Sequence, residues 1–214
     1  MLNILNHSPS AINHFLYEMR HKDIQKDRAK FRNNLKRLGM IMAYEISRKF
    51  TYSAKTITTP LAEHDVQLIE DKPVLIGVLR AATPFLDGFI EVFDDSDVGF
   101  IGAYRVEEGD EIEATLEYKA TNSLEGKTVI LIDPMLATGK SVLTSVNTLV
   151  NNGKPAHVHI AAAVAAPEGV SYISENLKTN HTIWTAALDE KLNEKAYIVP
   201  GLGDAGDLCF GPKL

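Results

Sequence analysis

Residues 131–142, LIDPMLATGKSV, contain the residue types of a phosphate-binding loop. Their Gly-Lys-Ser matches the end of the P-loop motif, but that motif also requires a glycine five positions before Gly139, where this chain has Pro134. The apolar run TVILI predicts a buried strand with Asp133 at its carboxyl end, followed by a helix beginning near Lys140. Open α/β sheets bind their ligands at such strand ends, so we predict a different kind of phosphate loop here.

The groups in this loop suit a phosphorylated sugar. A helix beginning near Lys140 presents its first backbone N–H groups and its dipole to an anion, because those amides have no acceptor within the helix. Thr138 and Ser141 add hydroxyl donors, and Gly139 allows the backbone to approach closely. Asp133 repels a phosphate but accepts hydrogen bonds from sugar hydroxyls. We therefore predict that the loop holds a ribose 5-phosphate.

The elements that must position this loop are those of an α/β fold. Between Pro73 and Leu188, short apolar runs alternate with loops and helical segments; the runs are PVLIGVL, VGFIGAYR, KTVILID, HVHIAAAVA and TIWTAAL. Runs without clean alternation are typical of parallel strands buried on both faces. Thr83 before Pro84 predicts the N-cap and first residue of a helix. We predict a central, mostly parallel sheet flanked by helices.

The flanking segments predict a helical start and a projecting arm. From about Asp23 to Lys49, apolar residues three or four apart indicate an amphipathic helix that packs on the core. Residues 104–120, YRVEEGDEIEATLEYKA, alternate polar and apolar residues, as an antiparallel arm does. Its acidic residues form either a solvated face or a flap over a site. We expect one domain over 1–214, with a helical or extended region over 1–70, an α/β core over 71–190 and a C-terminal part over 191–214.

Three basic residues of the N-terminal region, Arg20, Lys30 and Arg32, have a second interpretation. The simpler interpretation is that this region packs against the rest of the protein. The alternative is that these residues contribute to an anion site or to a subunit contact. His157 and His159 lie two apart in a predicted strand, but no other metal-ligand cluster accompanies them, so we expect no protein metal site.

Composition limits the class of protein. A hydrophobic content of 45% and a charged content of 23% are typical of a globular chain, and the net charge of −6 disfavours a protein that coats nucleic acid. The single cysteine, Cys209, excludes an internal disulfide. The N-terminus MLNILNHSPS lacks the features of a signal peptide, and the longest nearly apolar run, IAAAVAAP, is far shorter than the roughly 20 residues of a membrane span. We expect a soluble, cytoplasmic protein without nucleic-acid or membrane partners.

Several segments together resemble one family. DPMLATGKS resembles the phosphoribosyl diphosphate (PRPP) loop of uracil phosphoribosyltransferases, within the type I phosphoribosyltransferase superfamily. VLRAATPFLDG resembles the family's pyrophosphate-side loop, and LNEKAYIVPGLGDAGDLCFG is similar to its uracil-binding C-terminus. IGAYR and AAPEGV match further family segments, and all five occur in family order. The resemblance implies a phosphoribosyltransferase-like fold with a projecting β-arm and a C-terminal hood over the base, residues 191–214.

The resemblance also implies an activity: transfer of the 5-phosphoribosyl group from PRPP to uracil, giving UMP and pyrophosphate in pyrimidine salvage. Arginine suits the departing pyrophosphate because its guanidinium binds phosphate in a bidentate manner. The resemblance further implies substrate-bound Mg²⁺ and a homodimer or higher homo-oligomer, and it leaves a GTP effector open. The implied catalytic residues are Arg80, Arg105 and Asp204; those for PRPP are Arg80, Arg105, Asp133, Pro134, Met135, Leu136, Ala137, Thr138, Gly139, Lys140, Ser141 and Asp204; those for uracil are Ile198, Gly203, Asp204 and Ala205.

Two positions depart from the family pattern and keep alternatives open. Ala82 stands where the family commonly has glycine, and its methyl is expected to narrow access to the pyrophosphate. Lys140 stands where glycine is usual and adds charge. One alternative is a catalytically weak protein of this fold that regulates by binding a pyrimidine nucleotide or RNA. The others are a nucleotide kinase or NTPase, disfavoured by Pro134, and the same transferase acting on another base.

Overall fold

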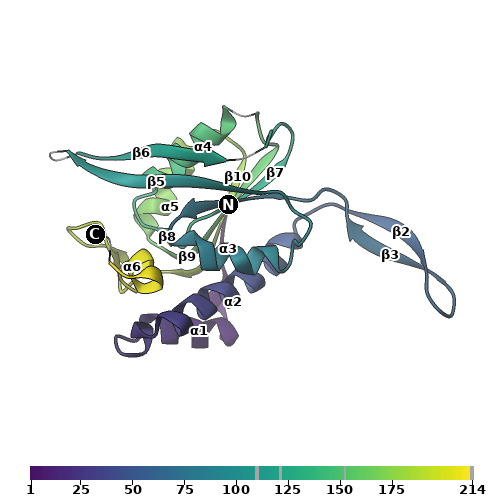
Figure 1. Ribbon diagram of the computed structural model, residues 1–214, viewed down its shortest axis with the longest axis horizontal. Helices are drawn as coiled ribbons and strands as arrows, with labels where there is room; N and C mark the ends of the chain where they lie inside the picture. The colour runs from purple at the N-terminus through teal and green to yellow at the C-terminus, as the bar shows by residue number, and fades with distance from the viewer. Residues whose placement is uncertain (109–110, 121, 152, 213–214) are drawn as a thin grey trace.

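The computed structural model describes residues 1–108, 111–120, 122–151 and 153–212, with the backbone alone from residue 103 to 120. Its centre is an eight-stranded sheet in the order β1-β10-β9-β7-β4-β5-β6, with β8 beside β9 (Figure 1). All pairs are parallel except β5 with β6. The strands are β1 (Leu2–Ile4), β4 (Val74–Leu79), β5 (Val98–Glu108), β6 (Glu111–Ala120), β7 (Thr128–Ile132), β8 (Met135–Leu136), β9 (His157–Ala165) and β10 (His181–Leu188).

This sheet confirms the predicted fold class, and each of the five apolar runs forms one strand: β4, β5, β7, β9 and β10. Strand β7 shows why these runs lack alternation. Ile130 and Ile132 pack into one hydrophobic cluster, and Val129 and Leu131 pack into a second. Both faces of the strand are therefore buried, and every position favours an apolar residue.

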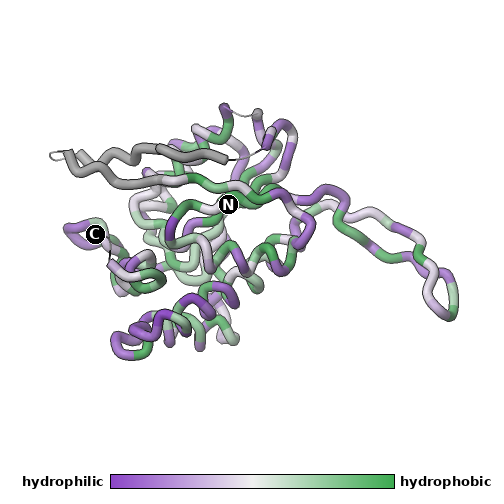
Figure 2. The backbone as a smooth tube through the Cα atoms, viewed as in Figure 1, coloured by the Kyte–Doolittle hydropathy of each residue, from purple (hydrophilic) through white to green (hydrophobic). Residues whose placement is uncertain are grey.

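Helices cover both faces of the sheet. The first cluster includes side chains of α1 (Ala11–Arg20), α2 (Arg28–Ser47) and α3 (Ala82–Ile90), and the second includes those of α4 (Lys140–Val150) and α5 (Pro167–Asn176). Figure 2 shows hydrophobic residues along the central strands and hydrophilic residues recurring along α1 and α2. In the described part of the chain, no helix has the length and apolar character needed to cross a membrane.

The N-terminal helix begins later than predicted. A short 3₁₀ turn, η2 (Ile24–Lys26), precedes α2, and Asp27 caps the helix by accepting a hydrogen bond from the Lys30 amide at 3.0 Å. A separate helix, α1, lies before it and begins with a capping box formed by Ser10 and Asn13. The predicted single helix from Asp23 was therefore wrong at its start, because the local cap at Asp27 sets where α2 begins.

Two antiparallel hairpins extend from the body in Figure 1. The first, β2 (Tyr52–Thr58) with β3 (Glu63–Ile69), is largely exposed and was not predicted. The second, β5 with β6, agrees with the predicted antiparallel arm. The side chains of residues 103–120 lie outside the description, so the choice between a solvated face and a flap stays open.

The chain ends in a small C-terminal unit at the carboxyl side of the sheet. Strands β11 (Lys191–Leu192) and β12 (Ile198–Val199) pair antiparallel, and α6 (Ala205–Phe210) follows. Another 3₁₀ turn, η1 (Leu5–His7), follows β1 near the N-terminus. Figure 1 shows the C-terminal unit beside α1 and α2, and α2 and α6 are in contact.

Candidate active site

A cavity of about 740 Å³ lies at the carboxyl ends of β4 and β7. This is the edge at which open α/β sheets bind ligands. Its walls come from the end of β4, the loop after β7 and the C-terminal unit, which are far apart in the sequence. The lining residues are Val78, Leu79, Arg80, Ala81, Asp133, Met135, Ala137, Ser141, Ala196, Tyr197, Ile198, Gly203, Asp204, Ala205, Gly206 and Pro212.

The loop after β7 is held by the neighbouring strand and ends at a helix N-terminus. The Asp133 amide donates to the Ala161 carbonyl at 3.0 Å, and the Asp133 carboxylate accepts from the Met135 amide at 3.2 Å. Gly139 has φ = 79° and is the N-cap residue of α4, which begins at Lys140 as predicted. The positive φ favours glycine here, and the turn directs the first amides of α4 towards the loop.

Helix α5 supports this loop from behind through Gly169. A Cβ atom at Gly169 would lie 2.3 Å from the Ala137 carbonyl oxygen, and one at Gly139 would lie 2.8 Å from the Gly169 carbonyl oxygen. Neither contact is sterically acceptable, so the two backbones can approach only as glycines. The AAPEGV segment therefore has a physical role as the backing of the loop, and Gly169 is a residue that sequence reasoning did not single out.

The loop residues predicted for PRPP divide into two groups. Asp133, Met135, Ala137 and Ser141 line the cavity. The others do not line it within the described part of the chain; they are Pro134, Leu136, Thr138, Gly139 and Lys140. The Leu136 side chain is buried in the core, and Lys140 is exposed. The Thr138 hydroxyl accepts a hydrogen bond from the Lys140 amide at 3.4 Å. Any contact of Leu136 with a ligand must therefore come from its backbone.

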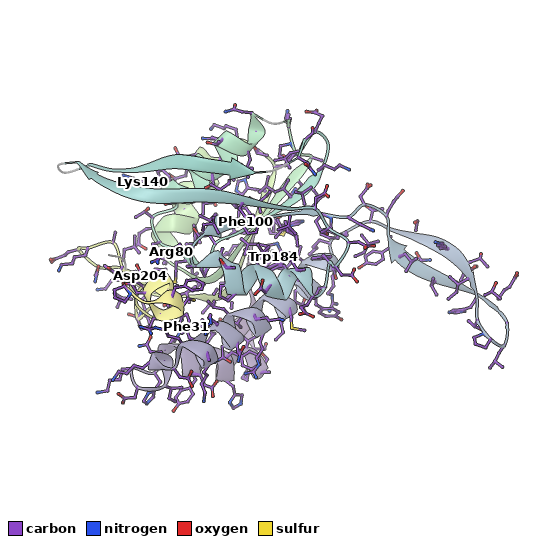
Figure 3. The ribbon with its side chains drawn as sticks, viewed as in Figure 1. Phe31, Arg80, Phe100, Lys140, Trp184 and Asp204 are labelled. Atoms are coloured by element: carbon purple, nitrogen blue, oxygen red, sulfur yellow. The ribbon has the colours of Figure 1, made fainter. Side chains whose placement is uncertain are left out.

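Arg80 and Asp204 line the same cavity although they are far apart in the sequence. In Figure 3, the labelled side chains lie close together, with Arg80 following β4 and Asp204 preceding α6. The Asp204 Oδ1 atom caps α6 by accepting a hydrogen bond from the Asp207 amide at 3.0 Å. The Asp207 carboxylate lies 3.7 Å from Arg80 Nη2, and both side chains are partly exposed. At this distance and exposure the ion pair is weak, and Arg80 is available to a ligand.

Comparison with known proteins decides the family. Residues 6–212 match the sequence model of the family described as uracil phosphoribosyltransferase. The chain belongs to the uracil phosphoribosyltransferase family. It is 45% identical over 206 residues to the uracil phosphoribosyltransferase of Porphyromonas gingivalis, which covers 96% of this chain and 95% of that protein.

Two solved structures are similar in fold to this chain. The AQ2163 protein from Aquifex aeolicus is 33% identical, with a TM-score of 0.88 over 99% of this chain and 98% of that chain. The L. donovani hypoxanthine-guanine phosphoribosyltransferase is 12% identical, with a TM-score of 0.51 over 76% of this chain and 81% of that chain. The second likeness concerns the fold alone.

All four residues predicted to bind uracil line the cavity. Ile198, Gly203 and Ala205 line the cavity with Asp204. Sequence reasoning missed several neighbours that also line it. These are Ala81, Ala196, Tyr197, Gly206 and Pro212. All but Pro212 lie inside the family segments VLRAATPFLDG and LNEKAYIVPGLGDAGDLCFG, so taking every residue of those segments as a candidate would have included them.

The structure corrects the expectation for Ala82. Helix α3 begins at Ala82, two residues before Pro84, and the Thr83 hydroxyl donates to the Arg80 carbonyl at 2.9 Å instead of capping a later helix. Ala82 is fully buried in the hydrophobic core and does not line the described cavity. Its methyl group points into the core because of its place in the first turn of α3. It therefore does not narrow the cavity.

Arg105 belongs to β5, where its backbone pairs with that of Ala114 in β6. Its side chain lies outside the described residues, so its part in binding PRPP stays a prediction. The backbone of β5 runs parallel to β4 and extends past the carboxyl end of β4.

The histidine pair lies in a different cavity, of about 310 Å³, near the amino ends of β7, β9 and β10. Trp184 Nε1 donates to His159 Nδ1 at 3.1 Å, and burial, aided by the charge of His157, lowers the pKa of His159 to about 3. His159 is therefore a neutral core residue at pH 7. Burial also lowers the pKa of His157, and burial raises the pKa of Cys209 to about 12. Among the described residues, no group of three or more His, Cys, Asp or Glu side chains is arranged to hold a metal.

Proposed function

We propose that this protein transfers the 5-phosphoribosyl group from PRPP to uracil and releases pyrophosphate, forming UMP. The supporting observation is that a member of the uracil phosphoribosyltransferase family brings the loop after β7 and its C-terminal unit to one cavity. The reaction needs both walls, because the ribose phosphate and the base must meet at the ribose C1 atom. In the transfer, a bond forms between uracil N1 and ribose C1, the C1–oxygen bond breaks with its electron pair leaving on pyrophosphate, and the N1 proton passes to solvent.

The proposed roles follow from charge and position. The N-terminus of α4, with Ser141 and Thr138, binds the 5-phosphate, since unpaired helix amides attract anions. Asp133 accepts hydrogen bonds from the ribose hydroxyls. Arg80 and Arg105 neutralise the pyrophosphate as it departs, which lowers the barrier only if they bind it more strongly in the transition state.

The base side depends on the C-terminal unit. Uracil alternates hydrogen-bond donors and acceptors along one edge, and backbone amides and carbonyls can match that pattern. Ile198, Gly203 and Ala205 line the cavity next to Asp204, with Gly203 at φ = 94°. We propose that these residues read the base and that the Asp204 carboxylate stabilises the positive charge that develops at ribose C1.

Magnesium fits this site as part of the substrate. Asp133 and Asp204 are the acidic side chains among the described residues that line the cavity, too few to form a metal cage of their own. Mg²⁺ keeps waters and phosphate oxygens as ligands, so an ion carried by PRPP needs only one or two protein carboxylates. Bound there, it would neutralise part of the diphosphate charge. A homodimer or higher homo-oligomer, a cytoplasmic location and a GTP effector are further proposals from the family resemblance.

The test is UMP formation from PRPP and Mg²⁺ with uracil, cytosine, hypoxanthine and orotate as parallel bases. We expect turnover with uracil alone. Arg80→Ala should raise the KM for PRPP or lower kcat, whereas Lys36→Ala, which removes an exposed ion pair with Glu91, should change neither. Turnover with a different base would contradict the assigned substrate. No turnover, despite measurable PRPP or UMP binding, would favour the regulatory alternative.

A further inference from the structure

Arg20 and Asp189 form an ion pair between two distant parts of the chain. Arg20 is the last residue of α1, and Asp189 follows the last residue of β10. Arg20 Nη2 lies 2.6 Å from Asp189 Oδ1, and Arg20 Nη1 donates to Asp189 Oδ2 at 2.8 Å. The Asp189 side chain is 4% exposed and that of Arg20 is 22% exposed. The contact is thus bidentate and mostly buried, unlike the exposed pairs elsewhere on the surface.

Both members of this pair also bind the backbone of Gly201. Arg20 Nη1 donates to the Gly201 carbonyl at 2.9 Å, and the Gly201 amide donates to Asp189 Oδ2 at 2.8 Å. The two polar backbone groups of one residue are therefore held by the two partners of one ion pair. Gly201 has φ = 62°, and a Cβ atom there would lie 2.1 Å from the Ile198 carbonyl oxygen, so this turn tolerates only glycine.

Gly201 is the centre of the turn that presents the base side of the cavity. Ile198 precedes it by three residues and Gly203 follows it by two, and both line the cavity. Arg20 and Asp189 are not among the described lining residues. The pair thus acts on the cavity wall from behind, through the backbone that carries the lining residues.

The sheet and the N-terminal helices are joined at this point. The Asp189 amide donates to the Ala165 carbonyl of β9 at 2.8 Å, which ties the carboxylate to the sheet. A second arginine, Arg32 of α2, donates to the Cys209 carbonyl of α6 at 2.7 Å. Both contacts agree with the packing interpretation of the two arginines, since Arg20 binds the Gly201 carbonyl and Arg32 binds the Cys209 carbonyl. Lys30 lies 3.4 Å from Glu18 in a partly exposed pair.

We propose that Arg20 and Asp189 are positioning residues for uracil, which fix the turn around Gly201 so that the base meets ribose C1 correctly. The inference rests on the proposed function. A buried ion pair is a poor source of stability, because desolvation offsets its attraction, whereas its fixed bidentate geometry determines the direction of the groups it binds. A base displaced by about 1 Å reacts much more slowly, so the rigidity of this turn bears directly on the use of uracil.

The experiment compares Arg20→Lys and Asp189→Asn with the wild type, with uracil and PRPP varied separately. Lysine keeps the charge but loses the planar fork, and asparagine keeps the shape but loses the charge. We expect the KM for uracil to rise, or kcat/KM for uracil to fall, by about tenfold or more, which corresponds to about 1.4 kcal/mol. The KM for PRPP should change by less than about twofold in both variants, because the pair does not contact the PRPP side of the cavity. Lys36→Ala is the control, since it removes a 2.6 Å ion pair between Lys36 of α2 and Glu91 after α3, away from the C-terminal unit.

A second measurement tests directly whether the turn around Gly201 loses its rigidity. Amide hydrogen exchange at Gly201, followed by NMR, should accelerate in both variants while exchange in the central strands stays slow. Unchanged uracil kinetics in both variants, with a lower melting temperature, would overturn the proposal and leave the pair a purely structural contact. Absence of wild-type turnover with uracil would instead refute the proposed function, and the inference with it. The two failures are therefore distinguishable from the wild-type rate alone.

Discussion

Asp204 has a structural role as the cap of α6 and a proposed role at the reacting centre, and Asp204→Asn separates the two. The Oδ1 atom of Asp204 accepts the hydrogen bond of the Asp207 amide at 3.0 Å. An asparagine Oδ1 atom can accept the same bond, and asparagine and aspartate are about equally good N-cap residues. The substitution thus removes the negative charge from the cavity and leaves the cap in place.

The expected changes in thermal stability and in kcat differ between Asp204→Asn and Asp204→Ala. Loss of the cap, as in Asp204→Ala, costs about 1 kcal/mol, which lowers Tm by about 2–4 °C in a protein of this size. Asp204→Asn should change Tm by less than about 1 °C, because asparagine keeps the cap. Removing one preorganised electrostatic group from an active site costs about 10²- to 10³-fold in kcat. Because Asp204 is exposed, water screens part of its charge, and we expect a fall of roughly 10- to 100-fold.

The assay is kcat for UMP formation at saturating uracil and PRPP, with Tm measured by calorimetry on the wild type, Asp204→Asn and Asp204→Ala. The charge role predicts that both variants lose activity and that only the alanine variant loses stability. Wild-type turnover in Asp204→Asn would refute the role of the charge. If activity falls only in Asp204→Ala, the capped geometry of α6 is what catalysis requires.

Three further predictions concern residues around the site and the core. Gly169→Ala should push the Ala137 carbonyl away, cost about 1–3 kcal/mol of stability and raise the KM for PRPP. The control is Gly126→Ala, where an added Cβ atom would meet no atom within 4 Å, so its cost is the strain at φ = 67° and the KM for PRPP should stay unchanged. An unchanged KM in Gly169→Ala would exclude α5 as the backing of the loop. Ala82→Gly should lower Tm by about 2–4 °C without raising kcat/KM for PRPP, because the lost methyl lies in the core; a raised value would restore the narrowing hypothesis. Burial lowers the pKa of His159 from 6.5 to about 3 in the folded protein, so the unfolded chain binds a proton more readily and the free energy of unfolding falls as the pH drops below 6.5. Between pH 7.5 and 5 the wild type should lose about 2 kcal/mol more than His159→Gln in urea unfolding, and equal losses would contradict the buried neutral histidine.

Local sequence was sufficient to predict a strand or a helix start where burial or turn geometry restricts the residue types at neighbouring positions. The run HVHIAAAVA was predicted as a strand and is β9, from His157 to Ala165, because a strand buried on both faces requires apolar residues at every position. The start of α4 after Gly139 was also predicted, since a glycine followed by a helical pattern has a local steric meaning. The exposed hairpin of β2 and β3 has no such burial pattern and was missed.

The start of the N-terminal helix shows an intermediate case. The apolar stripe from Phe31 to Ile46 was read correctly, and these residues are buried in α2. The boundary was wrong because a stripe reports which face is buried and not where the backbone first becomes helical. Asp27, the cap, decides the boundary through one hydrogen bond to the Lys30 amide.

The sequence by itself determined the fold class, the strand and helix on either side of the loop at residues 133–139 and most of the segments that meet at the cavity, because each has a local pattern of burial, turn chemistry or charge. Tertiary structure alone decided three things: the Ala82 methyl points into the core, Gly169 supports the loop, and Arg20 reaches Asp189 across 169 positions of the chain. Such contacts have no local signature. They depend on the phase of a helix and on which elements the sheet order places side by side, and those are set by the packing of the whole chain.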